Sequence, residues 1–212
     1  PNNAHNAEMQ ILDGILRIDG AGRIDNGDHW MPVTRNSTLN YNGTANQILR
    51  GAMSGTGALI KNNSGTLNLN GSNPFTGSVT INAGTLYANP GNAANNRACS
   101  FVSGITVNNG GTLRVGGNGL FGWDGTQARP VTVNTGATMT TDAANTDVNV
   151  GTITLNGGTL AGFSSPAWGS WNLKRVSGAK LLVTENSTVS APNVGLGASN
   201  SIDVSSGKTL TF

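Results

Sequence analysis

A Thr-Leu step recurs along this chain, each time inside the same short pattern. The pattern is apolar-x-apolar, then a polar turn of two to four residues that usually contains Gly, then Thr-apolar-x-apolar. Alternating apolar residues indicate β-strands that bury one face. A unit of about two dozen residues cannot bury a core alone and is typical of one coil of a solenoid. The aligned threonines are Thr38, Thr66, Thr85, Thr112, Thr138, Thr159, Thr188 and Thr209, which lie 28, 19, 27, 26, 21, 29 and 21 residues apart.

A meander of antiparallel hairpins is the competing interpretation, because short turns with Gly favour hairpins. A meander would show comparable turns between all of its strands. Here one short turn recurs per repeat, and the other connections are longer and vary in length. The pattern therefore predicts an all-β fold, a right-handed, single-stranded parallel β-helix of about eight to nine coils. We expect residues 1–212 to form one domain, with 1–30 as an N-terminal cap or an atypical first coil.

In such a coil the apolar residues on either side of the turn point inward and stack on those of the neighbouring coils. The asparagine that follows the first strand falls at the turn, where it can hydrogen-bond to its copies, and we interpret it as structural. The expected stack before the turn is Ile81, Val107, Val133, Leu155, Val183 and Val204, and the asparagines are Asn82, Asn108, Asn134 and Asn156. The expected stack after the turn is Leu67, Leu86, Leu113, Met139, Leu160, Val189 and Leu210.

One stretch of the chain, residues 57–89, carries a longer pattern that includes Gly57, Leu59, Lys61, Gly65-Thr66-Leu67, Gly71, Asn73, Gly77 and Gly84-Thr85-Leu86. It resembles the autotransporter-associated β-strand repeat, also called the passenger-associated transport repeat. Asn63 stands at a usual Gly and Phe75 at a usual Tyr. The resemblance implies a secreted passenger segment that is extracellular or on the cell surface, associated with the outer membrane of a Gram-negative-type bacterium.

The charge and composition exclude several classes of partner. Only 10% of the residues are charged, the formal net charge is +2, and Lys174-Arg175 is the one basic pair. A nucleic-acid binder would carry a basic patch, so we expect no nucleic-acid partner. The chain has no apolar run of the ~20 residues that a membrane-spanning helix needs, so we expect no membrane insertion. Cys99 is the single cysteine, which excludes an intrachain disulfide.

The acidic residues suggest two sites, and we expect neither to be real. Asp124 and Asp147 could meet on neighbouring coils as a glycosidase pair, but both stand in turn-like contexts. The run 15–30 gathers Asp19, Asp25, Asp28 and His29, although without the spacing of a calcium loop, and turn chemistry explains it. The sequence therefore predicts no catalytic residues, no metal site and no cofactor. The acids are Glu8, Asp13, Asp19, Asp25, Asp28, Asp124, Asp142, Asp147, Glu185 and Asp203.

Aromatic residues gather in the two segments 116–130 and 161–175, which follow the same strand of their coils. These segments should emerge on one side, two coils or roughly 10 Å apart. Exposed aromatic residues mark binding surfaces, including platforms for carbohydrates. The alternative, which we favour, is that the rings fold back over the core. The candidate binding patch is Phe121, Trp123, Trp168 and Trp171.

Together these features predict a non-enzymatic structural or adhesive segment, either a stalk or a subunit of a filament. Residues 202–212 end on a strand without a polar cap, so we expect a longer native chain or end-to-end stacking of copies. Surface glycans or a receptor on a host cell are the other partners considered. The alternatives are a β-helical enzyme acting on polysaccharide and a module that binds glycans or ice. Outward threonines such as Thr66, Thr85 and Thr112 suit an ice binder, but their irregular spacing argues against a flat array.

Overall fold

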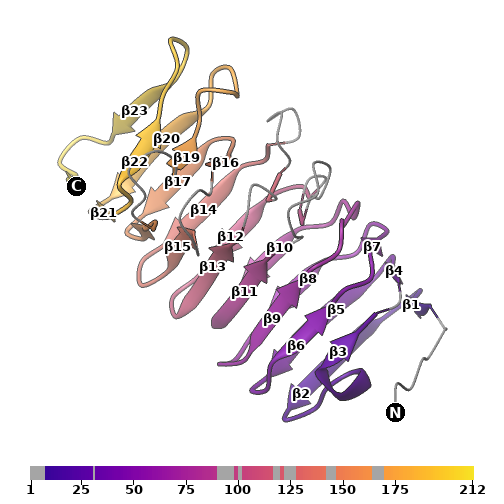
Figure 1. Ribbon diagram of the computed structural model, residues 1–212. Coiled ribbons are helices and arrows are strands. Elements are labelled where there is room, and N and C mark those ends of the chain that lie inside the picture. Colours follow the sequence, from indigo (N-terminus) through magenta and orange to yellow (C-terminus); the bar gives the residue numbers. More distant parts are fainter. Residues whose placement is uncertain are drawn as a thin grey trace.

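The computed structural model is an elongated β-solenoid in which coil stacks on coil, with the two termini at opposite ends (Figure 1). It describes residues 8–30, 32–89, 98–99, 102–116, 120–121, 128–141, 147–163 and 170–212, without the side chains of Asp147 and Ser170. The one helical segment among these residues is η1 (Asp25–Gly27), a single 3₁₀ turn. The expected all-β parallel solenoid is therefore confirmed.

Two sheets of nine strands run the length of the solenoid, one on each side of the recurring turn. The first long sheet contains β2 (Ile15–Gly20), β5 (Thr38–Gly43), β8 (Leu59–Lys61), β10 (Val79–Ile81), β12 (Ile105–Val107), β14 (Val131–Asn134), β17 (Ile153–Asn156), β20 (Lys180–Glu185) and β23 (Ser201–Val204). The second long sheet contains β3 (Asp28–His29), β6 (Gln47–Leu49), β9 (Thr66–Leu69), β11 (Gly84–Ala88), β13 (Gly111–Val115), β15 (Thr138–Thr141), β18 (Thr159–Leu160), β21 (Ser187–Val189) and β24 (Leu210–Thr211).

Two short sheets cover the third side of the solenoid at its two ends. Near the N-terminus, β1 (Met9–Ile11), β4 (Val33–Arg35) and β7 (Met53–Ser54) pair in that order. Toward the C-terminus, β16 (Asp147–Asn149), β19 (Ser170–Asn172) and β22 (Asn193–Gly195) do the same. The paired strands in all four sheets are parallel. One strand of each long sheet per coil gives a number of coils close to the eight or nine expected.

The core includes two apolar stacks that run along the solenoid axis. In the first long sheet Ile81, Val107, Val133, Leu155, Val183 and Val204 pair in register from strand to strand, as expected. In the second, Leu67, Leu86, Leu113, Met139, Leu160 and Val189 do the same. Every member is buried except Val204, which is 43% exposed. The repeat in the sequence thus predicted most members of both stacks correctly.

The expected alignment is wrong in the coils near the two ends. Thr38 lies in β5 of the first long sheet, whereas the alignment placed it in the second. A Thr-Leu step predicts only that an outward residue is followed by an inward one, and this alternation occurs in both long sheets. Leu210 pairs with Ser187 and not with Val189, because the turn before β24 is longer. Side chains alternate with a period of two, so this two-residue shift leaves the inward and outward faces unchanged.

Candidate functional site

The turn between the two long sheets carries a continuous ladder of asparagine side chains. Each amide nitrogen Nδ2 donates to the Oδ1 of the preceding asparagine, and the donor–acceptor distances run from 2.7 to 3.0 Å. The ladder confirms the structural role expected for four of these residues, and two further asparagines, Asn40 and Asn62, extend it toward the N-terminus. Its members are Asn40, Asn62, Asn82, Asn108, Asn134 and Asn156. Glycines with positive φ, such as Gly110 at 80° and Gly136 at 73°, turn the chain beside it.

At Lys61 an ammonium group is enclosed in this turn. Lys61 stands at an inward position, in register between Tyr41 and Ile81, and its side chain is buried. Its Nζ donates to the carbonyl oxygens of Asn62 (2.6 Å), Asn63 (2.7 Å) and Ala83 (3.1 Å). The ammonium also lies 5.5 Å from the centroid of the Tyr41 ring. Burial lowers the pKa of Lys61 to about 8.

A second buried cation, Arg35, lies on the third side of the same coils. Its Nη1 donates to the carbonyl oxygen of Gly57 at 2.5 Å, and its guanidinium lies 4.1 Å from the centroid of the Phe75 ring. Burial lowers the pKa of Arg35 to about 10. Among the described residues, the Nε and Nη2 atoms of Arg35 have no hydrogen-bond partner. Neither cation was predicted from the sequence to have a role, although the alternation Leu59-x-Lys61 places Lys61 at an inward position.

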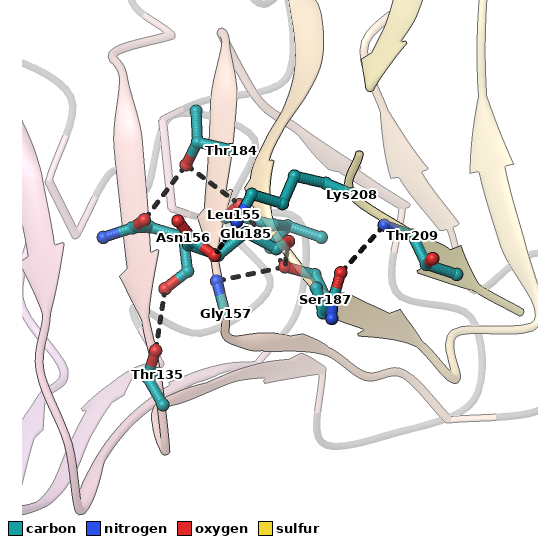
Figure 2. Close-up of polar contacts among 10 residues, drawn as sticks. Thr135, Leu155, Asn156, Gly157, Thr184, Glu185, Ser187, Lys208 and Thr209 are labelled. Carbon is teal, nitrogen blue, oxygen red and sulfur yellow. Dashed lines mark hydrogen bonds and ion pairs between the residues drawn. The ribbon is translucent and has the colours of Figure 1, made fainter. Parts of the chain in front are cut away.

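The asparagine ladder ends at Asn156, where hydroxyl groups replace the next amide (Figure 2). The pairing of β17 with β20 shifts between Leu155 and Asn156, so Asn156 pairs with Glu185. The hydroxyl of Thr184 donates to Asn156 Oδ1 at 3.1 Å. The buried hydroxyl of Ser187 accepts from the Gly157 N–H at 3.1 Å and lies 2.7 Å from the Glu185 carbonyl oxygen. These contacts satisfy backbone groups that the shift would otherwise leave unpaired.

The two coils that contain β8–β11, and Lys61 at the end of β8, thus combine a Gly turn, the ladder and the apolar stacks. Residues 59–88 match the family model of the passenger-associated transport repeat. The repeat and the parallel β-solenoid together fit a passenger-like segment of an autotransporter, which is the resemblance noted from the sequence. Searches of curated proteins and of solved structures gave no match.

All of the acidic residues lie outside the repeat. In the described part of the chain they are spread over several ion pairs: Asp19 with Arg17, Asp28 with Arg50, Glu185 with Lys208 and Asp203 with Lys180, each at 2.7 Å. Asp25 Oδ2 lies 2.5 Å from Nδ1 of the buried His29. Asp124 and the Asp147 side chain lie outside the described residues, so the expected absence of a catalytic pair stays a prediction. Within the described residues, no three His, Cys, Asp or Glu side chains converge as metal ligands.

The aromatic residues of the candidate patch also lie outside the repeat. Phe121 and Trp171 are buried in the core, and the indole N–H of Trp171 donates to the carbonyl oxygen of Ala161 at 2.7 Å. These two side chains are therefore not available to a ligand on this surface. Trp123 and Trp168 lie outside the described residues, so their share of the patch stays a prediction. In the part of the chain that the structure describes, no helix is long and apolar enough to span a bilayer.

Proposed function

We propose that this chain is a non-enzymatic, rigid spacer within a secreted passenger, carried on the surface of a Gram-negative-type cell. The match of residues 59–88 to the passenger-associated transport repeat supports secretion. The single observation that supports a spacer is the unbroken register of the two stacks through successive coils. A solenoid of this kind sets a length, because each added coil moves its two ends apart by about 4.8 Å.

The chemistry of the described residues agrees with a spacer. The acids pair with basic side chains at separate places along the solenoid. A glycosidase needs two carboxyl groups within about 5–9.5 Å of each other, flanking a bound sugar. We therefore assign the role of a spacer to the length and the rigidity of the solenoid.

Deleting one coil tests the proposal. Removing residues 82–107 joins Ile81 to Asn108, and because Ile81 and Val107 are in register, β10 can then pair directly with β14. In a fusion between an N-terminal epitope and an outer-membrane barrel, we expect the full chain and the shortened chain to display the epitope equally well. Small-angle scattering of the two purified chains should show a maximum dimension shorter by about one coil, or about 4.8 Å.

The matched control removes residues 82–94, half of that coil, which breaks the register and should abolish display. Two outcomes contradict the proposal. One is loss of display after the full-coil deletion while the purified variant remains folded. The other is cleavage of pectin, alginate or a related uronate polymer by the wild-type chain, with loss of cleavage in Asp124→Asn or Asp147→Asn.

A further inference from the structure

Four strands of the first long sheet carry the same outward threonine, and two residues later, at the end of the strand or just past it, an asparagine follows. The threonines Thr80, Thr106, Thr132 and Thr154 pair with one another in register on β10, β12, β14 and β17. The asparagines Asn82, Asn108, Asn134 and Asn156 form the ladder beside them. We call these eight residues the Thr-Asn face. Strand geometry places them on a grid of about 4.8 Å across the strands and about 6.6 Å along them.

The grid is regular although the sequence spacing is not. The four threonines lie 26, 26 and 22 residues apart, yet their strands pair without a shift. The extra residues are accommodated elsewhere in each coil. Irregular spacing along the sequence therefore does not prevent a regular array of threonines on this sheet.

The groups on the Thr-Asn face are held in place before any ligand arrives. Each asparagine amide is fixed by ladder bonds of 2.7–3.0 Å, and one N–H per amide remains for an outside acceptor. Threonine is β-branched, which restricts its first side-chain torsion. Within the described residues, the hydroxyls of the four threonines form no hydrogen bond inside the protein. A surface fixed in this way loses little conformational entropy on binding.

The chemistry of the Thr-Asn face limits the kinds of partner that it can bind. None of the four strands carries a charged or aromatic residue. The ion pairs on this sheet lie toward its ends, at Arg17–Asp19 and Lys180–Asp203. A charged polymer would find no counter-charge here, and a sugar ring would find no aromatic ring to stack on. Evenly spaced hydroxyls, amide groups and methyls instead suit a neutral partner that is itself periodic and hydrogen-bonds through water.

From this geometry we propose that the Thr-Asn face binds the surface of an ice crystal. The hydroxyls and free amide N–H groups hold water molecules in the spacing of the grid, while the threonine methyls fill the gaps between them. A bridging water is enthalpically nearly as good as a direct hydrogen bond, and its cost is small where the surface already orders it. Each contact is weak, and attachment depends on all eight residues engaging the lattice together. This activity is separate from the spacer role and does not depend on it.

The outward face of the second long sheet supplies a matched control within the same molecule. It also carries a threonine ladder, from Thr66 to Thr188, in register through five successive strand pairs. Two residues further on, however, its outward positions hold Asn68, Tyr87, Arg114 and Thr140. The second column is therefore irregular and carries a charge, so this face does not present a uniform grid.

The test measures thermal hysteresis, the gap between the melting and freezing temperatures of a single ice crystal, with the purified 212-residue chain. We expect faceted crystals and a measurable gap for the wild type. The double variant Thr106→Tyr/Thr132→Tyr should lose the gap, because two rings project from the centre of the grid. The control Thr112→Tyr/Thr138→Tyr, at outward positions of β13 and β15, should keep it. Tyrosine is well tolerated in strands, and circular dichroism checks that both variants remain folded.

A readout that needs no variant is the binding of fluorescently labelled wild-type chain to defined planes of a growing ice crystal. Binding to a defined plane supports the proposal. Three results would overturn it: no hysteresis and no plane binding for the wild type, equal loss in both double variants, or loss in the control pair alone. Binding to insoluble cellulose or chitin in place of ice would also overturn it, since the face would then recognise a glycan.

Discussion

The coils near the N-terminus and those in the middle of the solenoid solve the same packing problem with different interiors. From β4 to β8 the core holds two cations: Lys61 donates to three backbone carbonyls and Arg35 to one, and each lies near an aromatic ring. From β10 to β15 the inward positions are occupied by aliphatic side chains such as Val107 and Leu113. The backbone and the register are alike in both regions. The difference lies in the turns, whose carbonyl oxygens either are free to accept a hydrogen bond from a cation or are not.

The turn geometry explains the difference. Beside Lys61, Asn63 adopts a positive φ of 61°, and three carbonyl oxygens face the ammonium. Beside Val107, the carbonyl oxygen of Asn108 already accepts from the Gly111 N–H at 2.8 Å. A buried ion costs several kcal/mol unless hydrogen bonds compensate for lost water. We therefore expect a cation to be tolerated at the inward position of Lys61 but not at the equivalent position of Val107, two coils later.

Placing a lysine at Val107 should break the comparison with the largest effect. We expect Val107→Lys to lower the free energy of unfolding by about 3–5 kcal/mol, because the ammonium would be buried without acceptors. Urea denaturation followed by circular dichroism measures this. The control Thr106→Lys, whose side chain points outward on the same strand, should stay within about 0.5 kcal/mol of the wild type. Equal stability of the two variants would show that the turn at Val107 can also enclose a cation.

Removing the cation at Lys61 is the converse experiment. Lys61→Met keeps the volume but leaves the carbonyl oxygens of Asn62, Asn63 and Ala83 without their donor. Orphaned acceptors of this kind cost about 1–3 kcal/mol in the free energy of unfolding. Urea denaturation near pH 7 should show that loss, and Lys180→Met, at an exposed position, should not. A variant more stable than the wild type would mean that desolvating the ammonium outweighs its three hydrogen bonds.

The pH dependence sharpens the same point. Burial lowers the pKa of Lys61 to about 8, from the ordinary lysine value of 10.5. Between these values the unfolded chain binds more protons than the folded one, so this residue makes stability rise with pH. We expect the stability difference between the wild type and Lys61→Met to grow from about pH 7.5 to about pH 9.5. Taking the difference removes the contribution of Arg35, and a gap that stayed constant would mean that folding does not lower the pKa of Lys61.

The stacks and the ladder could be predicted from the sequence because they repeat. Leu67 to Val189 and Ile81 to Val183 follow from alternation and from a turn that contains Gly, which fix both face and register. The coils near the ends could not be aligned, because Gln47 occupies the place of the Thr-Leu step and pairs with Leu67. The buried cations were missed because their hydrogen-bond acceptors are backbone carbonyls, which any residue type can supply. Burial of Phe121 and Trp171 matches the interpretation that the rings cover the core, and not that they bind a ligand.

The asparagine ladder should contribute less than either interior. Asn108→Ala removes the bond of 2.7 Å to Asn82 and the bond of 2.7 Å from Asn134. Because the ladder is only partly buried, water replaces much of what is lost, and we expect a loss of about 1 kcal/mol in the free energy of unfolding. Thermal denaturation compared with Thr132→Ala, whose hydroxyl has no partner among the described residues, isolates the contribution of the ladder. Equal effects of the two substitutions would argue that the ladder orders the turn without stabilising it.

The smallest effect is expected at the exposed ion pair between Lys180 and Asp203, which joins β20 to β23 at 2.7 Å. Both side chains are nearly half exposed, and water and salt weaken such pairs. The hydrogen bond from Lys180 lowers the pKa of Asp203, so its contribution is present at neutral pH and is lost as the pH falls through that lowered value. In Lys180→Ala we expect the Asp203 pKa, followed by NMR, to rise toward its usual value while the melting temperature hardly changes. A drop in melting temperature as large as that of Asn108→Ala would mean that this exposed pair holds the last coils together.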